Sequence, residues 1–264
     1  MIMAMKTEHI SMNLGAFQLK DISLSIPKGK ITGIVGPNGS GKSTLLKVMT
    51  RLLTADHGAV YVQDKNSSTY KAKDFAKTVS MLPQSKDNLP NLTVRELITF
   101  GRSPYKGFFN NQMTDDDESI ILEAMQMTGT KKHESRLFSS LSGGEQQKVR
   151  IAMALAQKTE ILLLDEPTTY LDIAHQLDVM ELLLHINQRY NTTIIMVLHD
   201  LQQTANYCDF MIAMKQGKVV DSGTPPSTLT ADFLRHVFEI NARVLYEDGY
   251  PLIIPKTRFK GRKK

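Results

Sequence analysis

The residues of this sequence with the clearest chemical meaning form a glycine-rich stretch near its start. Residues 36–43 read GPNGSGKS, which matches the pattern GxxxxGK[ST] between an apolar run and a helix expected from Thr44 onward. The glycines let the chain curl with its N–H groups inward, so that Lys42 contacts the β and γ phosphates of a nucleotide and Ser43 ligates magnesium. The pattern predicts a phosphate loop for ATP rather than a turn with a surface lysine. We expect the nucleotide contacts to come from Gly36, Pro37, Asn38, Gly39, Ser40, Gly41, Lys42, Ser43 and Thr44.

A pair of carboxylates follows a second apolar run. Asp165 and Glu166 come directly after the sequence ILLL and directly before a proline. We expect Asp165 to hold magnesium, through a water molecule, and Glu166 to orient or deprotonate the water that attacks the terminal phosphate. A simple turn would explain two acids before proline, but not their occurrence together with a phosphate loop.

A second glycine-rich stretch, LSGGE at residues 141–145, lies between these two motifs. Ser142 and Glu145 fit a capping box at the start of a helix. The box does not explain Gly143 and Gly144, because each glycine in a helix costs about 1 kcal/mol relative to alanine. Two glycines are useful where a phosphate must approach the backbone of a helix N-terminus closely. The stretch therefore predicts an anion-binding helix start.

Four short apolar runs are expected as buried strands of a parallel sheet. They cover residues 31–35, 79–82, 161–164 and 192–198. The chemically active residues follow these runs: Gly36 after the first, Gln84 after the second, Asp165 and Glu166 after the third, and His199 after the fourth. Ligands of open α/β sheets bind outside the carboxyl ends of the strands, so these endings predict one common site. That position favours a functional His199 over a structural one.

The remaining segments predict an α/β fold with two additions to the P-loop core. Alternating segments at residues 18–26 and 58–63 are expected as an N-terminal antiparallel β subdomain. Residues 93–158 are expected as an inserted α-helical subdomain, with a capping box at Thr93 and Glu96. The acidic run at 115–118 is expected as a helix first turn rather than a metal site. We expect one domain over 1–264, with a catalytic core at 1–92 and 159–225, and a C-terminal part at 226–264. That part would contain a helix capped by Thr230, a hairpin around Asp248 and Gly249, and a basic tail.

Composition indicates a folded chain with a near-neutral body. Of the 264 residues 41% are apolar and 22% charged, and the formal charge is +5. Six of the 32 basic residues lie in the last nine positions, which leaves 26 basic against 27 acidic residues in the rest. A nucleic-acid-binding body is therefore disfavoured. The tail at 256–264 is expected to be solvated, with contact to an anionic membrane surface as the alternative.

Neither a membrane helix nor a secretory signal is predicted. No stretch reaches the roughly 18 consecutive apolar residues that a membrane helix needs, and the N-terminal residues lack a signal-peptide core. We expect the chain to remain in the cytosol. Its single cysteine, Cys208, is expected as a buried thiol within a helix, without a role of its own.

With these motifs in this order, residues 10–240 resemble the ATP-binding cassette subunits of ABC transporters. The resemblance implies a head-to-tail dimer in which the signature LSGGE of one copy caps the γ-phosphate held by the phosphate loop of the other. It assigns Gln84 to the Q-loop, which contacts magnesium and the attacking water. It also assigns Leu171 and Asp172 to the D-loop at the dimer seam, and His199 to the switch histidine that contacts the γ-phosphate. Permease helices would dock between the core near Gln84 and the helical insertion.

A narrower similarity is carried by GRSPYKG at 101–107, IAMALAQ at 151–157 and DEPTTYLDIAHQL at 165–177. These segments resemble the ATPases of ferric-siderophore importers, with haem and cobalamin importers as alternatives. The resemblance implies a peripheral protein at the cytoplasmic face of the cell membrane, which powers a permease. An extracytoplasmic binding protein would be an indirect partner. In that family the binding protein and the permease contact the cargo, and the ATPase does not.

Two positions depart from the family pattern. Glu145 stands where the signature more often has glutamine, which adds a negative charge near the opposing nucleotide. The aromatic residue that stacks on adenine would fall nearer Asn13 than Phe17. Phe17 nevertheless remains a candidate for this stacking, with a strand core residue as the equal alternative.

Other functional classes fit less well. A soluble cassette ATPase of translation or DNA repair usually carries two cassettes or a long coiled coil, and a kinase would not need LSGGE. Export in place of import stays open.

Overall fold

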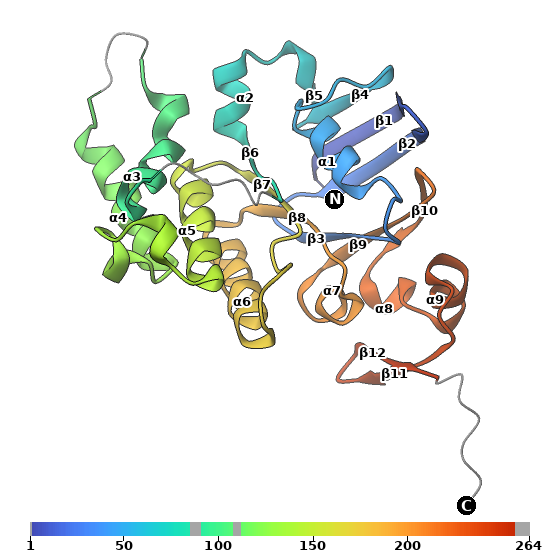
Figure 1. Ribbon diagram of the computed structural model, residues 1–264. Coiled ribbons are helices and arrows are strands. Elements are labelled where there is room, and N and C mark those ends of the chain that lie inside the picture. Colours follow the sequence, from blue (N-terminus) through green and yellow to red (C-terminus); the bar gives the residue numbers. More distant parts are fainter. Residues whose placement is uncertain (1, 85–90, 108–111, 257–264) are drawn as a thin grey trace, which may run out of the picture.

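The structure is a computed structural model that describes residues 2–84, 91–107 and 112–256. Its centre is a sheet of six strands in the order β10-β9-β3-β8-β7-β6 (Figure 1). The pairs from β9 to β6 are all parallel, and β10 is an antiparallel edge strand. The strands are β3 (Ile31–Val35), β6 (Val79–Leu82), β7 (Ile161–Asp165), β8 (Thr193–Val197), β9 (Phe210–Lys215) and β10 (Lys218–Gly223). The predicted parallel core is confirmed.

Burial on both faces explains why β3, β7 and β8 are almost purely apolar. Along β7, Leu162 and Leu164 pack into one hydrophobic cluster, and Ile161 and Leu163 pack into a second. Side chains of a strand alternate between the two faces of a sheet, so a strand covered on both faces needs apolar residues at every position. The result is a rigid strand whose end fixes the position of Asp165.

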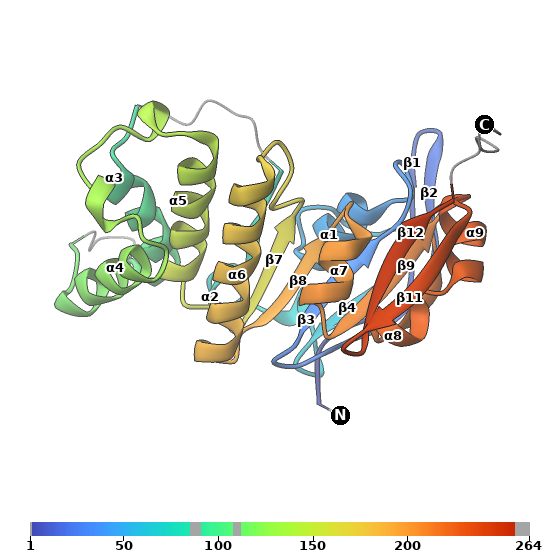
Figure 2. The ribbon, with the colours of Figure 1, turned by 90° about the horizontal axis from the view of Figure 1, so that it is seen from below.

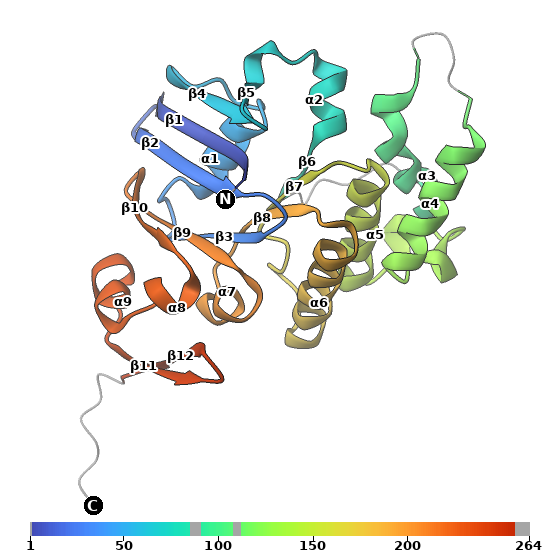
Figure 3. The ribbon, with the colours of Figure 1, turned by 180° about the vertical axis from the view of Figure 1, so that it is seen from behind.

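A four-stranded antiparallel sheet covers one face of the core, with order β2-β1-β4-β5. Helix α1 (Lys42–Met49) lies between the two sheets, and its Leu45, Leu46 and Met49 are fully buried there (Figures 1 and 3). The strands are β1 (Met3–Leu14), β2 (Phe17–Pro27), β4 (His57–Val62) and β5 (Lys65–Asn66). The fold thus buries the apolar face of the helix that follows the phosphate loop.

Helices α6 (Ile173–Tyr190) and α7 (Leu201–Tyr207) cover the opposite face of the central sheet (Figure 2). The chain then forms α8 (Pro225–Thr228), α9 (Ala231–Phe238) and the hairpin of β11 (Ala242–Glu247) and β12 (Tyr250–Pro255). Thr230 caps α9, as the sequence indicates. Cys208 is buried, but it follows α7 instead of lying within a helix, because the chain turns extended there to enter β9. The tail beyond Lys256 lies outside the described residues.

Helices α3 (Val94–Thr99), α4 (Asp115–Met127) and α5 (Gly143–Ala156) form a hydrophobic cluster of their own, on one side of the molecule (Figure 1). Capping boxes begin all three, at Thr93, Thr114 and Ser142. The shorter elements are α2 (Ala72–Thr78) and the 3-10 turns η1 (Ser67–Thr69), η2 (Phe100–Tyr105), η3 (Lys131–His133) and η4 (Phe138–Ser140).

A buried ion pair joins η2 to α4. Arg102 donates from Nε to Asp117 Oδ1 at 2.7 Å, and both side chains are at least 92% buried, with exposures of 3% and 8%. Arg102 also donates to the carbonyl of Ala156 at 2.9 Å. Burial raises the pKa of Asp117, but the hydrogen bonds from Arg102 and Thr114 outweigh it and leave that pKa below its usual value. The acidic run therefore supplies a structural carboxylate as well as a favourable first turn.

We expect Asp117→Ala to lower the free energy of unfolding by about 3–5 kcal/mol, because it leaves the Arg102 guanidinium buried and unpaired. Asp116→Ala is the matched control, since Asp116 lies exposed in the same helical turn and its loss should cost less than about 1 kcal/mol. Urea unfolding of the two variants measures the difference. Equal losses would contradict the role assigned to the ion pair.

Candidate functional site

The phosphate loop connects β3 to α1 and has a conformation that only glycine adopts easily. Gly36, Gly39 and Gly41 have φ of 151°, 75° and 102°. A Cβ on Gly36 would lie 2.1 Å from the carbonyl oxygen of Met214, so this position also lacks space for a side chain. Lys42 is 5% exposed and donates to the carbonyls of Gly36 and Pro37 at 2.8 and 3.1 Å. Burial lowers the pKa of Lys42, an effect that Glu166 and Asp165 oppose.

Asp165 ends β7 directly beside the loop. Ser43 donates its hydroxyl hydrogen to Asp165 Oδ1 at 2.8 Å. Burial raises the pKa of Asp165, whereas the hydrogen bond from Ser43 opposes this rise. Two hard oxygen ligands thus lie next to each other, which is the ligand type that magnesium prefers. Within the described residues, no group of three His, Cys, Asp or Glu side chains could hold a metal ion.

Glu166 is the point at which three other side chains meet. Gln84 donates its amide hydrogen to Oε2, and Thr169 donates its hydroxyl hydrogen to Oε2 at 3.0 Å. His199 pairs through Nε2 with Oε1. The Glu166 side chain is only 12% exposed, and its backbone has φ of 53°. A non-glycine residue held in the left-handed region carries a conformational cost, which functional sites commonly contain. Sequence reasoning found Gln84 and His199 but missed Thr169.

A pocket of 200 Å³ lies beside the loop, and all of its lining residues belong to the predicted site. It is lined by Phe17, Asn38, Gly39, Gly41, Lys42, Ser43, Thr44, Glu166 and His199. The ring of Phe17 lies against Gly41, where a Cβ would come within 2.6 Å of its Cζ atom. Phe17 begins β2 and its side chain is half-buried, so it faces the loop without belonging fully to the core.

The signature residues lie elsewhere. Among the described residues, none of those at 142–145 lines this pocket, and α5 lies apart from α1 in Figures 1 and 2. Ser142 caps α5, and Glu145 returns its carboxylate to the Ser142 N–H and hydroxyl at 2.9 and 3.0 Å. The chain therefore brings together its phosphate loop, its acidic pair, Gln84 and His199, but not its own signature.

The two signature glycines have different surroundings. Among the described residues, and apart from its own helix backbone and chain neighbours, the nearest atom to a Cβ on Gly143 would be Cδ2 of Leu171 at 3.8 Å. A Cβ on Gly144 would lie 2.0 Å from Cδ2 of His175. His175 is held by Asp172, whose Oδ1 accepts from its backbone N–H at 2.9 Å and lies 2.8 Å from Nδ1. Asp172 caps α6, and the hydrogen bond from the His175 backbone lowers its pKa. Close packing within the chain thus accounts for Gly144, and Gly143 is open to an outside group.

The parallel sheet, the glycine-rich loop at a helix start and the paired acids define a P-loop nucleoside-triphosphate-binding domain. Comparison with known proteins specifies the class. The ABC transporter family model matches residues 19–169. The iron(3+)-hydroxamate import ATP-binding protein of Bacillus subtilis (strain 168) is 45% identical over 243 residues, which are 92% of this chain and 90% of that protein. The chain belongs to the ABC transporter family and is one of its ATP-binding subunits.

Solved structures agree with this assignment. An inward-facing ABC transporter assigned to the metal-chelate type matches with a TM-score of 0.84 and 25% identity, over 97% of this chain and 98% of that one. A dimeric bacterial ABC transporter cassette matches with a TM-score of 0.72 and 28% identity, over 84% and 98%. The described part of this chain contains no helix of the length and apolarity that crossing a membrane requires.

We expect Gly144→Ala to lower the free energy of unfolding by about 1–3 kcal/mol, because the new methyl group displaces either the backbone or the His175 ring. Gly143→Ala is the control and should leave stability unchanged or raise it by up to about 1 kcal/mol through helix propensity. Thermal unfolding compares the two. In a His175→Ala background, Gly144→Ala should cost much less than it does in the wild-type protein. A loss of the same size in both backgrounds would exclude His175 as the cause.

Proposed function

We propose that this chain is the ATP-hydrolysing subunit that powers import of an iron chelate, a ferric siderophore, through a membrane permease. The observation that carries the ATPase part is the convergence of Gln84, Thr169 and His199 on Glu166, beside the phosphate loop. The iron-chelate part is supported by 45% identity, over nine-tenths of its length, to a protein that imports iron(3+)-hydroxamate. Haem and cobalamin import are the alternatives within the same class.

The residues fit an in-line attack of water on the γ-phosphate. Lys42 and the loop N–H groups hold the phosphates, because the pocket beside the loop is lined by these groups. Glu166 accepts a proton from the attacking water, and its three partners fix the direction of its carboxylate. His199 lines the pocket and contacts the γ-phosphate, while Phe17 stacks on the adenine. Ser43 and Asp165, with Gln84 nearby, would hold magnesium, which neutralises charge on the β and γ phosphates when bound.

A second copy of the chain completes the site. The chain's own signature does not line its pocket, and Gly143 is open on the side away from the chain. In a head-to-tail dimer the start of α5 would place its free N–H groups against the γ-phosphate of the partner copy. Asp172, exposed at the start of α6, would lie at the seam. The matching cassette structure with a TM-score of 0.72 is dimeric, which supports the pairing of two copies.

We place the permease contact at a groove formed by α3 and η2. The cavity measures 590 Å³ and is lined by Lys73, Leu92, Arg95, Glu96, Thr99, Phe100, Ser103, Lys106 and Gly107. Phe100 is 56% exposed, which is unusual for a large aromatic side chain and fits an apolar contact with a permease helix. The protein would then lie at the cytoplasmic face of the cell membrane, where the permease holds it.

We expect Glu166→Gln to reduce ATP turnover by about 10²- to 10⁴-fold, because the amide cannot accept the proton of the attacking water. ATP binding should be retained, so the variant should accumulate as an ATP-bound dimer, measured by light scattering after size-exclusion chromatography. The control is Glu239→Gln, a carboxylate that is 82% exposed and remote from the pocket. A Glu166→Gln protein with normal turnover would exclude the proposed role.

Co-purification tests the proposed permease contact at Phe100. Phe100→Asp should abolish co-purification with the permease, since a carboxylate would be buried in an apolar contact. Leu122→Asp on α4, where the wild-type side chain is 37% exposed and outside the groove, is the matched control and should co-purify normally.

Addition of ferric siderophores should stimulate ATP hydrolysis by the complete importer reconstituted with its binding protein. Stimulation by haem or cobalamin alone would reassign the cargo.

A further inference from the structure

Glu145 presents a chemical conflict at the start of α5. Its carboxylate belongs to the first turn of the helix whose N–H groups would face the γ-phosphate of the partner copy. A negative charge in the first turn stabilises the helix, but the same charge repels a phosphate that approaches from outside. The direction in which this carboxylate is held therefore matters for ATP binding at the dimer interface.

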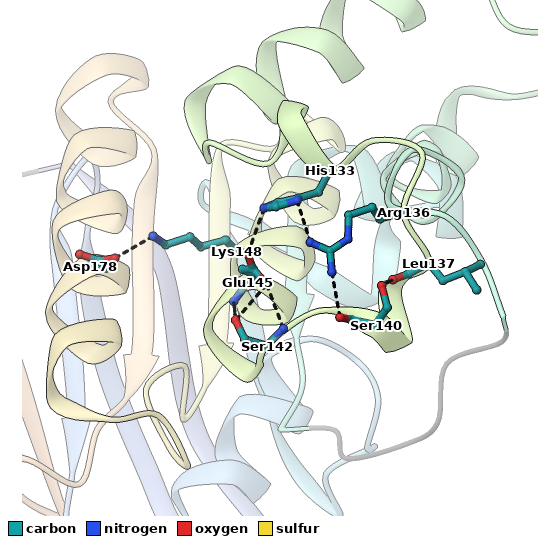
Figure 4. Close-up of polar contacts among 8 residues, drawn as sticks. All are labelled: His133, Arg136, Leu137, Ser140, Ser142, Glu145, Lys148 and Asp178. Carbon is teal, nitrogen blue, oxygen red and sulfur yellow. Dashed lines mark hydrogen bonds and ion pairs between the residues drawn. The ribbon is translucent and has the colours of Figure 1, made fainter.

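The structure turns the carboxylate toward Ser142 and His133 of the same chain (Figure 4). Oε2 accepts from the N–H and hydroxyl of Ser142, and Oε1 lies 3.0 Å from Nε2 of His133 in the turn η3. The His133 side chain is 12% exposed, against 33% for Glu145. Its Nε2 makes no directed hydrogen bond within the described part of the chain, so the contact with Glu145 is electrostatic. His133 thus presents a buried, otherwise unpartnered polar atom to the signature carboxylate.

Arg136 orients the histidine from the other side. Its Nη1 lies 3.3 Å from His133 Nδ1, and its Nη2 donates to the carbonyl of Ser140 at 3.1 Å (Figure 4). A guanidinium group can only donate, so Nδ1 is the acceptor and the ring proton lies on Nε2, the nitrogen that is 3.0 Å from Glu145 Oε1. The positive charge of Arg136 acts on Glu145 through this ring.

A cation on the same helix as Glu145 has a different partner. Lys148, one turn further along α5, donates to Asp178 on α6 at 2.8 Å (Figure 4). The hydrogen bonds from the Ser142 backbone and hydroxyl, with smaller contributions from His133 and Arg136, hold the pKa of Glu145 below its ordinary value. The carboxylate is therefore charged at neutral pH. Its negative charge is offset by His133 of η3 and by Arg136.

We propose that His133 is a positioning residue for the signature: with Arg136, it draws the charge of Glu145 away from the γ-phosphate of the partner copy. The inference rests on the head-to-tail dimer of the proposed function. Without His133, Oε1 loses its buried contact, and the charge acts on the incoming phosphate. The effect requires a charge at residue 145, which separates it from a purely structural role.

The test measures the ATP concentration that gives half-maximal dimer formation, in full-length protein that carries Glu166→Gln to prevent hydrolysis. His133→Leu should raise this concentration about three- to tenfold at low salt, as expected for one exposed charge near another. The difference should shrink at about 0.5 M salt, because screening weakens exposed charges. His133→Gln, which retains an N–H donor at a similar distance, should restore most of the affinity.

Glu145→Gln provides the decisive arm. Pairing of this variant should need less ATP than pairing of the parent, and adding His133→Leu to it should cause no further change. A defect of His133→Leu that persists unchanged in the Glu145→Gln background, or in high salt, would overturn the inference in favour of a folding role. If the parent protein forms the ATP-driven dimer and His133→Leu needs no more ATP than the parent, the inference about His133 is overturned while the proposed dimer stands. A parent that shows no ATP-driven pairing would instead overturn the proposed dimer, and this inference with it.

Discussion

The position of Glu166 depends on one constraint, which is that β7 is buried on both faces of the central sheet. A strand fixed in this way ends at a defined point, and Glu166 is the first residue beyond it. The same holds for β6 and β8, whose ends supply Gln84 and His199. Because three parallel neighbours deliver these side chains to one edge, their carboxylate, amide and imidazole meet without help from a flexible loop. The apolar cores on the two faces of the sheet thus determine the geometry of the polar site.

The sequence was sufficient to predict what local pattern controls. The strands β3 and β6 have the predicted bounds, and β7 and β8 differ from prediction by one residue at one or both ends, because continuous apolar runs have few alternatives. The capping boxes at Thr93 and Ser142 were equally clear, since three-residue spacing defines them. Strand β1 was not predicted, because its apolar residues are interrupted by polar ones and its pairing with β2 contains register shifts.

Contacts between distant segments were beyond a reading of one sequence. Nothing local to Asp117 indicates that Arg102 is its buried partner, and nothing local to Gly144 indicates the ring of His175. The sequence interpretation assigned both signature glycines to the approach of a phosphate. The structure shows different reasons for the two glycines. Packing against His175 requires Gly144, whereas Gly143 has no such close neighbour among the described side chains. Residue type alone cannot make this distinction, since both reasons require the same missing Cβ.

The signature helix is consequently held by contacts that also reach the hydrolytic core. Lys148 on α5 pairs with Asp178 on α6, and Gly144 accommodates His175, which Asp172 holds at the start of the same helix. Helix α6 begins shortly after Glu166 in the chain. A shift of α5 along α6 would break the ion pair between Lys148 and Asp178 and would move His175 away from Gly144. Packed side chains of this kind have discrete arrangements and do not deform continuously. Movement of the start of α5 away from α6 would therefore separate Gly144 from the His175 ring, which Asp172 holds at the start of α6.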